Sequence, residues 1–370
     1  MKTVLISGAS VAGPALAYWL RRHGFTPTVV ERASALRPGG QAIDVRGVAM
    51  EVVARMGIEA EVRRARTRMR GMSTVDGDGN ETWRSTEMTF SAGRLDSGDV
   101  ELLREDLTSL LYERTRDDVE YVFGDSIETL EEEEHGVRAG FEHGEARAFD
   151  LVVGADGLHS NVRRLAFGEE GRFIHPLGTH LAIFSADNFL NLDNWQVWYR
   201  EGDAGYGIYP VRGNTEIRVT LGFASEPPGH DYGDAERQKR LVAERLSGLR
   251  WETPRLLKAM WEAPDFYFDA MAQIRADRWT KGRVTLLGDA GYCPSPLSGQ
   301  GTSLALVGAY VLAQELGRAG DDHEAAFTRY ERRMRPFAEL NQALATENPG
   351  GAASEESIDR AKNGISLDAG

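Results

Sequence analysis

The N-terminal stretch of the chain reads TVLISGASVAGPALAYWLRRHGFTPTVVE over residues 3–31. Residues 3–7 are apolar or β-branched and predict a strand, residues 15–23 suit a helix, and residues 27–30 begin a second strand. Gly24 stands where a helix C-cap is expected. A strand, a glycine turn, a helix and a second strand form one βαβ unit, so the sequence predicts a Rossmann-type α/β domain at its start.

The turn between this strand and this helix has the pattern of a dinucleotide-binding loop. Its residues are Gly8, Ala9, Ser10, Val11, Ala12 and Gly13. Such a loop brings backbone N–H groups and the helix N-terminus to a pyrophosphate, although Ser10 replaces the middle glycine of the GxGxxG pattern and weakens the motif. Glu31, about twenty residues further on and followed by Arg32, can accept hydrogen bonds from ribose hydroxyls. The loop alone fits NAD as well as FAD.

The remaining pattern alternates between helical and strand periodicity. Helices are expected at residues 48–56, 100–114, 234–246, 303–316 and 321–340. The turn DGDG at 76–79 predicts a hairpin within residues 71–98, and short buried strands are expected at 151–153 and 284–287. The acidic run at 131–134 is expected to be a solvated loop. Residues 173–268 alternate with a period of two and predict a mainly antiparallel sheet.

Two further motifs follow predicted strands. LVVGADGLHSNVRR, residues 151–164, delivers Asp156 to a turn after an apolar strand. GRVTLLGDAGYCPSPLSGQGTSL, residues 282–304, presents Asp289 before a loop of small residues that runs into a helix. Glycines near the start of that helix allow backbone N–H groups, with the helix dipole behind them, to approach an electron-rich ring edge.

Composition excludes several classes of protein. The formal net charge of -14 over 370 residues argues against nucleic acid as a partner, which requires a concentrated basic surface. The single cysteine, Cys293, excludes an internal disulfide, and no paired Cys or His spacing predicts a metal site. No apolar run reaches the ~18 residues of a membrane span, and residues 1–8 carry no signal-type segment. We therefore expect a cytoplasmic protein that does not bind membranes, and a monomer by default.

Taken together, the motifs at 8–13, 151–164 and 282–304 resemble those of the flavoprotein aromatic hydroxylases of the p-hydroxybenzoate hydroxylase type, the group A flavoprotein monooxygenases. The sequence is most similar to the branch that contains the tetracycline-inactivating monooxygenases. The resemblance implies an α/β fold: a Rossmann-like FAD domain of the GR2 type with an inserted, mainly antiparallel β-sheet substrate domain. The implied ranges are 1–70, 99–171 and 277–340 for the FAD domain, 71–98 and 172–276 for the substrate domain, and 341–370 for a C-terminal tail or helix.

The resemblance also implies roles for individual residues. The loop of Gly8, Ser10, Val11, Ala12 and Gly13 would hold the pyrophosphate, with Glu31 and Arg32 at the adenosine ribose. Asp289 would bind the ribityl chain or the pyrophosphate region. The residues that would lie against the isoalloxazine are Pro296, Gly299, Gln300, Gly301 and Thr302.

Four charged residues complete the implied cofactor site. Arg104 matches a helix arginine that contacts FAD, Asp44 matches an aspartate close to the flavin, and Arg37 matches a position that holds NADPH. Asp156 matches the family's middle motif, which is associated with both FAD and NAD(P)H. The candidates for the substrate pocket are Arg46, Trp198, Tyr209 and Pro294.

The implied function is that of an FAD-dependent monooxygenase. NAD(P)H would reduce FAD, O2 would add to form a C4a-hydroperoxyflavin, and one oxygen atom would pass to an aromatic or polycyclic, antibiotic- or polyketide-like small molecule. No catalytic base is identifiable by spacing, so the chemistry is expected to be flavin-centred. Two alternatives stay open: a related flavin dehydrogenase, reductase or decarboxylating hydroxylase, and a non-catalytic FAD-binding protein. The glycine loop at 299–301 argues against the non-catalytic alternative.

Overall fold

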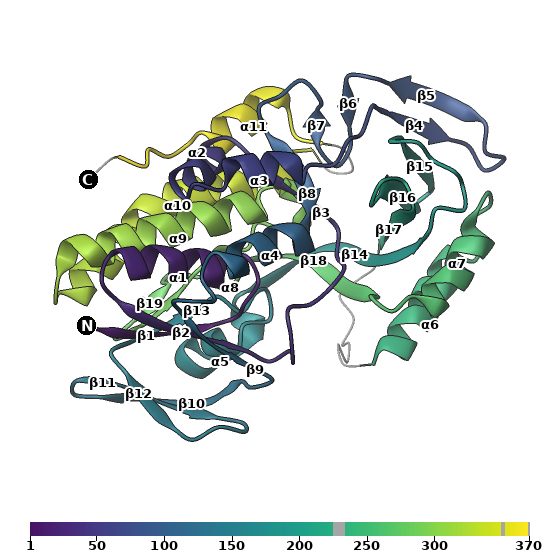
Figure 1. Cartoon of the computed structure of the whole chain (residues 1–370). Helices are drawn as coiled ribbons and strands as arrows, with labels where there is room; N and C mark the ends of the chain where they lie inside the picture. Colours follow the sequence, from purple (N-terminus) through teal and green to yellow (C-terminus); the bar gives the residue numbers. More distant parts are fainter. Residues whose placement is uncertain (225–233, 349–351, 369–370) are drawn as a thin grey trace.

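The computed structural model describes residues 1–224, 234–348 and 352–368. Figure 1 shows two halves, one built on a mostly parallel sheet covered by helices and the other on a larger, mainly antiparallel sheet. The chain leaves the first half and returns to it, and extended strands connect the two halves. The predicted α/β fold with an antiparallel sheet is confirmed.

A six-stranded sheet forms the first half, and its parallel strands carry the predicted βαβ unit. In spatial order its strands are β19 (Thr280–Lys281), β20 (Val284–Leu286), β13 (Leu151–Gly154), β1 (Thr3–Ser7), β2 (Thr26–Glu31) and β9 (Glu120–Phe123). Only β19 is antiparallel to its neighbour. The strands β1 and β13 are buried almost throughout because helices cover the parallel sheet. The motifs at residues 8–13 and 151–164 therefore leave neighbouring strands at the same edge.

Helices surround this sheet and supply most of the larger hydrophobic core. They are α1 (Ala12–Arg22), α2 (Val48–Arg55), α3 (Glu59–Arg64), α4 (Arg104–Glu113), α5 (Asn161–Phe167), α8 (Asp289–Tyr292), α9 (Gly301–Ala319) and α10 (His323–Glu347). The helix α9 packs against α1, α2 and α10 and is buried along most of its length, which explains its apolar sequence. Smaller elements beside them are β3 (Ala42–Val45), β8 (Val100–Leu103), β10 (Ile127–Glu133), β11 (Gly136–Phe141), β12 (Arg147–Phe149) and the 3-10 turns η1 (Glu170–Arg172) and η2 (Pro296–Ser298).

A seven-stranded sheet forms the second half. In spatial order its strands are β18 (Tyr267–Ile274), β14 (Ile174–Asp187), β17 (Glu216–Ala224), β16 (Ala204–Val211), β15 (Gln196–Glu201), β4 (Met72–Val75) and β5 (Glu81–Ser85). Every neighbouring pair is antiparallel except β15 with β4. A second core lies between this sheet and the helices α6 (Ala235–Leu246) and α7 (Thr253–Glu262). The short hairpin of β6 (Met88–Thr89) and β7 (Gly93–Arg94) follows β5.

Two sequence predictions of secondary structure were wrong in part. Residues 100–103 form strand β8 rather than the first turn of a helix, because they pair with β3 in an antiparallel ladder. The acidic run at 131–134 was expected to be a loop, but residues 131–133 belong to β10, which pairs with β11. Their side chains are exposed, as predicted, because this strand lies at the edge of a three-stranded sheet.

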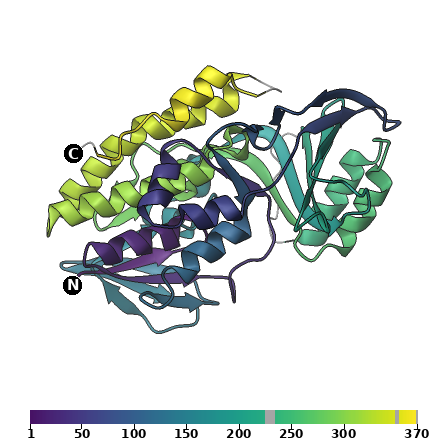
Figure 2. The same cartoon turned by 45° about the horizontal axis from the view of Figure 1, so that its top comes forward.

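The C-terminal part of the chain folds back over the first half. The helix α10 continues to Glu347, past the predicted end at residue 340, and α11 (Glu355–Lys362) lies against it. Figure 2 shows both helices in yellow-green and yellow above the helices of the first half. The polar sequence after residue 345 thus contains a short helix, which was one of the two predicted outcomes.

Candidate active site

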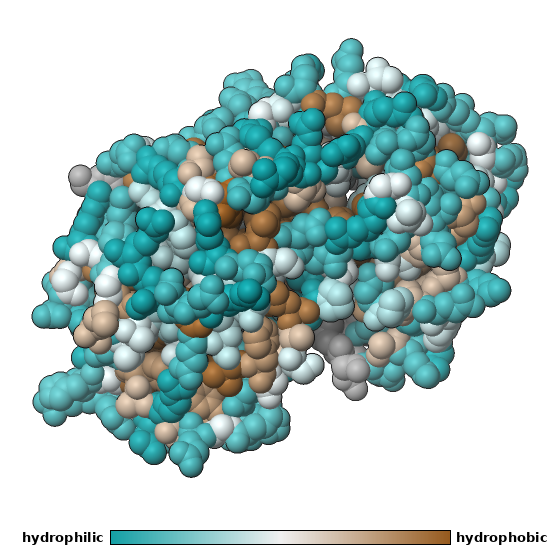
Figure 3. All heavy atoms as spheres, viewed as in Figure 1, coloured by the Kyte–Doolittle hydropathy of each residue, from teal (hydrophilic) through white to brown (hydrophobic). Residues whose placement is uncertain are grey.

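A cavity of about 2280 Å³ runs between the two halves of the molecule. In Figure 3 hydrophobic side chains are visible in the hollow between the halves, with hydrophilic side chains around them. The predicted site residues that line the cavity are Gly8, Ser10, Val11, Ala12, Glu31, Arg32, Arg37, Asp44, Arg46, Arg104, Asp156, Trp198, Tyr209, Asp289, Pro294, Pro296, Gly299, Gln300, Gly301 and Thr302. Gly13 is not among the lining residues. The fold therefore brings together positions that are almost 300 residues apart in the sequence.

The glycine loop at one end of the cavity is packed too closely for larger residues. A Cβ atom on Gly8 would lie 2.4 Å from the carbonyl oxygen of Ala155, and one on Gly13 would lie 1.9 Å from the carbonyl oxygen of Gly8. Gly8 also has a φ of +105°, which favours glycine. Glu31 accepts a hydrogen bond from the Ala9 amide at 2.9 Å, so the acidic residue at the end of β2 contacts the loop directly. Val11 and Ala12 line the cavity, so the N-terminus of α1 is open to it.

The loop at the other end of the cavity leads into helix α9. Ser295 and Gly299 have φ values of +75° and +64°, and Gln300 is the residue before the first turn of α9. The Gln300 side chain is fully buried, yet its amide oxygen and nitrogen form no hydrogen bond with the described part of the chain. A buried amide normally has partners, so a polar group bound in the cavity would complete this site. The adjacent amides of α9 and its dipole favour negative charge there.

Asp44 and Arg46 form a buried ion pair beside the α9 loop. Arg46 Nη2 lies 2.8 Å from Asp44 Oδ2, and both side chains are 8 % exposed. Arg46 also donates to the Ser91 carbonyl oxygen, and a Cβ on Gly299 would lie 3.4 Å from its Nη1. Burial raises the pKa of Asp44 to about 7 despite the nearby guanidinium, and the neighbouring Glu101 carboxyl adds to the rise. The wall of the cavity next to α9 therefore contains a carboxyl that titrates near neutral pH.

The two motif aspartates differ in their surroundings. Asp156 accepts hydrogen bonds from the Ser7 and Ser160 hydroxyls and from the Val162 amide, so its carboxylate fixes the start of α5. Asp289 is half-buried at the first position of α8 and faces the cavity. Burial raises its pKa. Asp289 interacts with the Cys293 thiol, whereas Asp156 accepts from three donors, so Asp289 has the freer carboxylate for a ligand.

The candidate pocket residues Trp198 and Tyr209 on the antiparallel sheet are held by hydrogen bonds to neighbouring residues. The Trp198 indole donates to Gln196 Oε1 at 3.1 Å and packs over Gly207, while the Tyr209 hydroxyl accepts the Ala42 amide at 2.9 Å. Phe90, which is half exposed, meets Trp198 edge to face with the ring centroids 5.4 Å apart. Phe90, Trp198 and Tyr209 thus give the cavity an aromatic wall.

Sequence reasoning missed several residues that line the cavity. The histidine in the middle motif, His159, lies between two carboxylates, with Nδ1 2.6 Å from Glu170 and Nε2 3.1 Å from Asp269. Burial alone would lower the pKa of His159, but the two carboxylates outweigh it and raise the pKa. Residues of the C-terminal segment also reach the cavity, including Ile358 and Lys362. The one sequence signal for His159 is its position in the same motif as Asp156.

The sequence profile of the FAD-binding domain family matches residues 1–345. The chain belongs to this family. FAD is therefore its cofactor, and the cavity fits it: the close-packed glycine loop, the unpartnered Gln300 amide and the N-terminus of α9 are the features such a ligand needs. The resemblance to the flavoprotein monooxygenases is confirmed by the relatives and solved structures that follow.

Relatives of this flavoprotein cover nearly all of its length. A protein of Mycobacterium tuberculosis named as uncharacterized is 54% identical over 99% of both chains. A flavin-dependent monooxygenase of Legionella longbeachae is 41% identical over 92% of this chain and 86% of its own. The crystal structure of tetracycline destructase Tet(55) superimposes with a TM-score of 0.89 at 37% identity over 100% of this chain and 99% of that one. That of Tet(51) gives a TM-score of 0.91 at 34% identity over all of both chains.

The described residues contain neither a candidate membrane span nor a candidate metal site. None of the helices in residues 1–224, 234–348 and 352–368 has the length and apolarity needed to cross a membrane. Within the same residues, no group of three or more His, Cys, Asp or Glu side chains is placed to hold a metal ion.

Proposed function

We propose that this flavoprotein uses NAD(P)H and O2 to hydroxylate an aromatic or polycyclic small molecule in the cavity between its two sheets. The single observation that carries the proposal is that one cavity extends from the glycine loop to the aromatic wall of the antiparallel sheet. Bound FAD supplies the redox chemistry with oxygen, and the protein binds, orients and shields the reactants. The tetracycline destructase structures, at 34% and 37% identity, support an antibiotic-like substrate.

We assign the FAD contacts to the residues at both ends of the cavity. The glycine loop at 8–13 and the N-terminus of α1 would hold the pyrophosphate, and Glu31 with Arg32 the ribose. Asp289 would bind the ribityl chain or pyrophosphate region. The residues from Pro296 to Thr302 would lie along the flavin ring. These assignments are supported by the cavity lining, by the half-buried Asp289 carboxylate and by the unpartnered Gln300 amide in the described part of the chain.

The remaining contacts divide between the pyridine nucleotide and the substrate. Arg37 is exposed and lines the cavity, and it would bind NADPH or NADH. Asp44 and Arg104 also line the cavity and would contact the flavin. The substrate would lie against Arg46, Trp198, Tyr209 and Pro294. The division into an FAD domain and a substrate domain at the boundaries given above stays a prediction, as do the cytoplasmic location, the monomeric state and the lack of nucleic-acid binding.

The test begins with the purified protein and added FAD. Consumption of NADPH and NADH is then measured with phenols, naphthoquinones, anthraquinones, tetracyclines and rifamycins, and labelled O2 is followed into the product. Label in the product is expected. Substrate oxidation without label would favour the dehydrogenase alternative, and failure to bind FAD would contradict the proposal. Asp289→Ala should weaken FAD binding at least tenfold, and unchanged FAD binding would overturn the role of Asp289.

A further inference from the structure

The segment that carries Arg37 has no regular secondary structure, yet three neighbouring side chains and one backbone amide hydrogen-bond to its backbone. We refer to residues 36–41 as the Arg37 segment; four of its residues line the cavity. The Arg104 guanidinium donates to the carbonyl oxygens of Arg37 and Gly39, at 3.2 and 3.0 Å, and the Arg104 amide donates to the carbonyl oxygen of Gln41. A loop held in this way keeps its side chains in a defined place relative to the cavity.

The antiparallel sheet holds the same segment from the opposite side. Arg218 of β17, which is 2 % exposed, donates from Nε to the carbonyl oxygen of Gly40 at 3.1 Å. Gly39 has a φ of +72°, and a Cβ there would lie 2.4 Å from Oδ2 of Asp265. Asp265 is in turn fixed by the amide and hydroxyl of Ser185. At position 39 the backbone conformation and the space beside Asp265 thus favour glycine.

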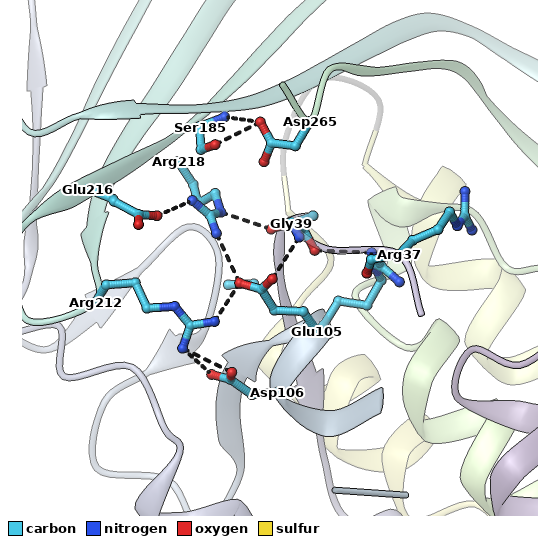
Figure 4. Close-up of polar contacts among 12 residues, drawn as sticks. Arg37, Gly39, Glu105, Asp106, Ser185, Arg212, Glu216, Arg218 and Asp265 are labelled. Carbon is cyan, nitrogen blue, oxygen red and sulfur yellow. Dashed lines mark hydrogen bonds and ion pairs between the residues drawn. The ribbon is translucent and has the colours of Figure 1, made fainter. Parts of the chain in front are cut away.

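Glu105 of α4 joins these two sides. Its Oε2 accepts the Gly39 amide at 2.7 Å, and its Oε1 lies 2.5 Å from Arg212 and 3.1 Å from Arg218 (Figure 4). Burial alone would raise the pKa of Glu105, but the Gly39 amide and the two guanidiniums outweigh it and hold the pKa below its ordinary value. One carboxylate therefore ties together α4, the Arg37 segment and β17.

We propose that Glu105 is a positioning residue that couples the antiparallel sheet to the cofactor cavity by fixing the Arg37 segment, and with it the Arg37 side chain, for binding of the pyridine nucleotide. The pyridine nucleotide in this inference rests on the proposed function, whereas the contacts of Glu105 are observed in the structure. Figure 4 shows Arg37 pointing away from the Glu105 cluster, so Glu105 acts on it through the backbone. Charge-assisted hydrogen bonds of this kind are shorter and stronger than neutral ones, which suits a rigid support.

The test compares Glu105→Ala and Glu105→Gln with a matched control on the same helix. Glu113→Gln is suitable because Glu113 pairs only with the half-exposed Arg116, 3.1 Å away, among the interactions described. Amide hydrogen exchange of a peptide covering residues 36–43 is measured first. Glu105→Ala should accelerate exchange at least tenfold, and Glu105→Gln less, because an amide oxygen can still accept the Gly39 N–H. The control should match the wild type, and unchanged exchange in Glu105→Ala would overturn the proposal.

Kinetics separate positioning from a general loss of structure. Glu105→Ala should raise KM for NADPH about tenfold while kcat and the Kd for FAD stay within about twofold of the wild type, and Glu105→Gln should restore most of the loss. Parallel loss of kcat and FAD binding in both variants would mean that Glu105 is merely structural and would overturn the proposal. If the wild type binds no FAD or oxidises no pyridine nucleotide, the proposed function fails, whereas the exchange experiment still decides whether Glu105 holds the segment.

Discussion

At the scale of single residues, Asp44 shows how burial changes the chemistry of a side chain that the sequence already marks. It lies 2.8 Å from Arg46, an arrangement that by itself would keep a carboxylate ionised. Burial, together with the nearby Glu101 and Asp99 carboxyls, nevertheless raises the pKa of Asp44 to about 7. The cost of removing charge from water outweighs one favourable neighbour. Asp44 is therefore one of the residues in the cavity wall that should respond to pH near neutrality.

The raised pKa of Asp44 means that the free energy of unfolding should fall as pH rises. Because the folded-state pKa of Asp44 is above its unfolded value, its contribution is fully present below the unfolded pKa and is lost as pH rises through about 7. From pH 5.5 to pH 8 the FAD-free wild type should lose on the order of 2 kcal/mol relative to Asp44→Asn, whose side chain does not titrate. Urea denaturation at both pH values measures this difference. Equal pH dependence in the two proteins would show that Arg46 keeps Asp44 ionised throughout.

At the scale of elements, a buried carboxylate joins the two long helices behind the cavity. Glu315 of α9 is 1 % exposed and lies 2.7 Å from both Arg329 and Arg333 of α10. Burial would raise the pKa of Glu315, but the two guanidiniums outweigh it and lower the pKa. The stability that Glu315 contributes is present above its unfolded pKa and is lost as pH falls through the depressed folded value.

Removal of this carboxylate should destabilise the protein markedly. Glu315→Ala removes the carboxylate from the mostly buried Arg333 and from Arg329, which is 35% exposed. Breaking a buried ion pair costs about 3–5 kcal/mol, and we expect about 3 kcal/mol here because water solvates Arg329 and Arg333 keeps its bonds to Gln314 and to two carbonyl oxygens. The exposed Glu339 on α10 provides the control, because Glu339→Ala should change stability by less than about 0.5 kcal/mol. Chemical denaturation at pH 7 compares the three proteins. If Glu315→Ala were as stable as the control, packing alone would hold α9 and α10 together.

At the scale of the whole molecule, ion pairs tie the end of the chain to its first half, and the pair of Lys362 with Asp99 is more buried than that of Asp368 with Arg55. Lys362 Nζ lies 3.0 Å from Oδ2 of Asp99, and both side chains are mostly buried, at 17% and 14% exposed. Asp99 also accepts the Gly47 amide at 2.9 Å, next to α2. Helix α11 is thereby fixed beside the cavity, which Lys362 itself lines.

Lys362→Met should loosen α11 without unfolding the core. The expected loss is about 1–3 kcal/mol, because the variant leaves a largely buried carboxylate without its cation. Lys2→Met is the control: Lys2 pairs with the fully exposed Asp321, and exposed pairs contribute about 0–1 kcal/mol. Thermal unfolding and limited proteolysis after residue 352 measure both effects. Equal proteolysis of the two variants would show that the apolar contacts of α11 suffice.

The sequence by itself determined the elements whose signal is local. The βαβ unit, the close-packed glycines at positions 8 and 13, and the strand before Asp289 all follow from periodicity and turn residues, and the structure has them. The three motifs also converge on one cavity, as expected for turns at the carboxyl ends of neighbouring parallel strands.

Tertiary structure alone decided the features that depend on distant partners. Residues 100–103 look helical in the sequence but form β8, because pairing with β3 outweighs a weak local preference. The contact of Glu105 with Arg218 joins residues 113 positions apart, and neither residue has a local pattern that announces the other. Local periodicity reports which face of an element is buried, whereas the choice of polar partners is made only when two elements pack together.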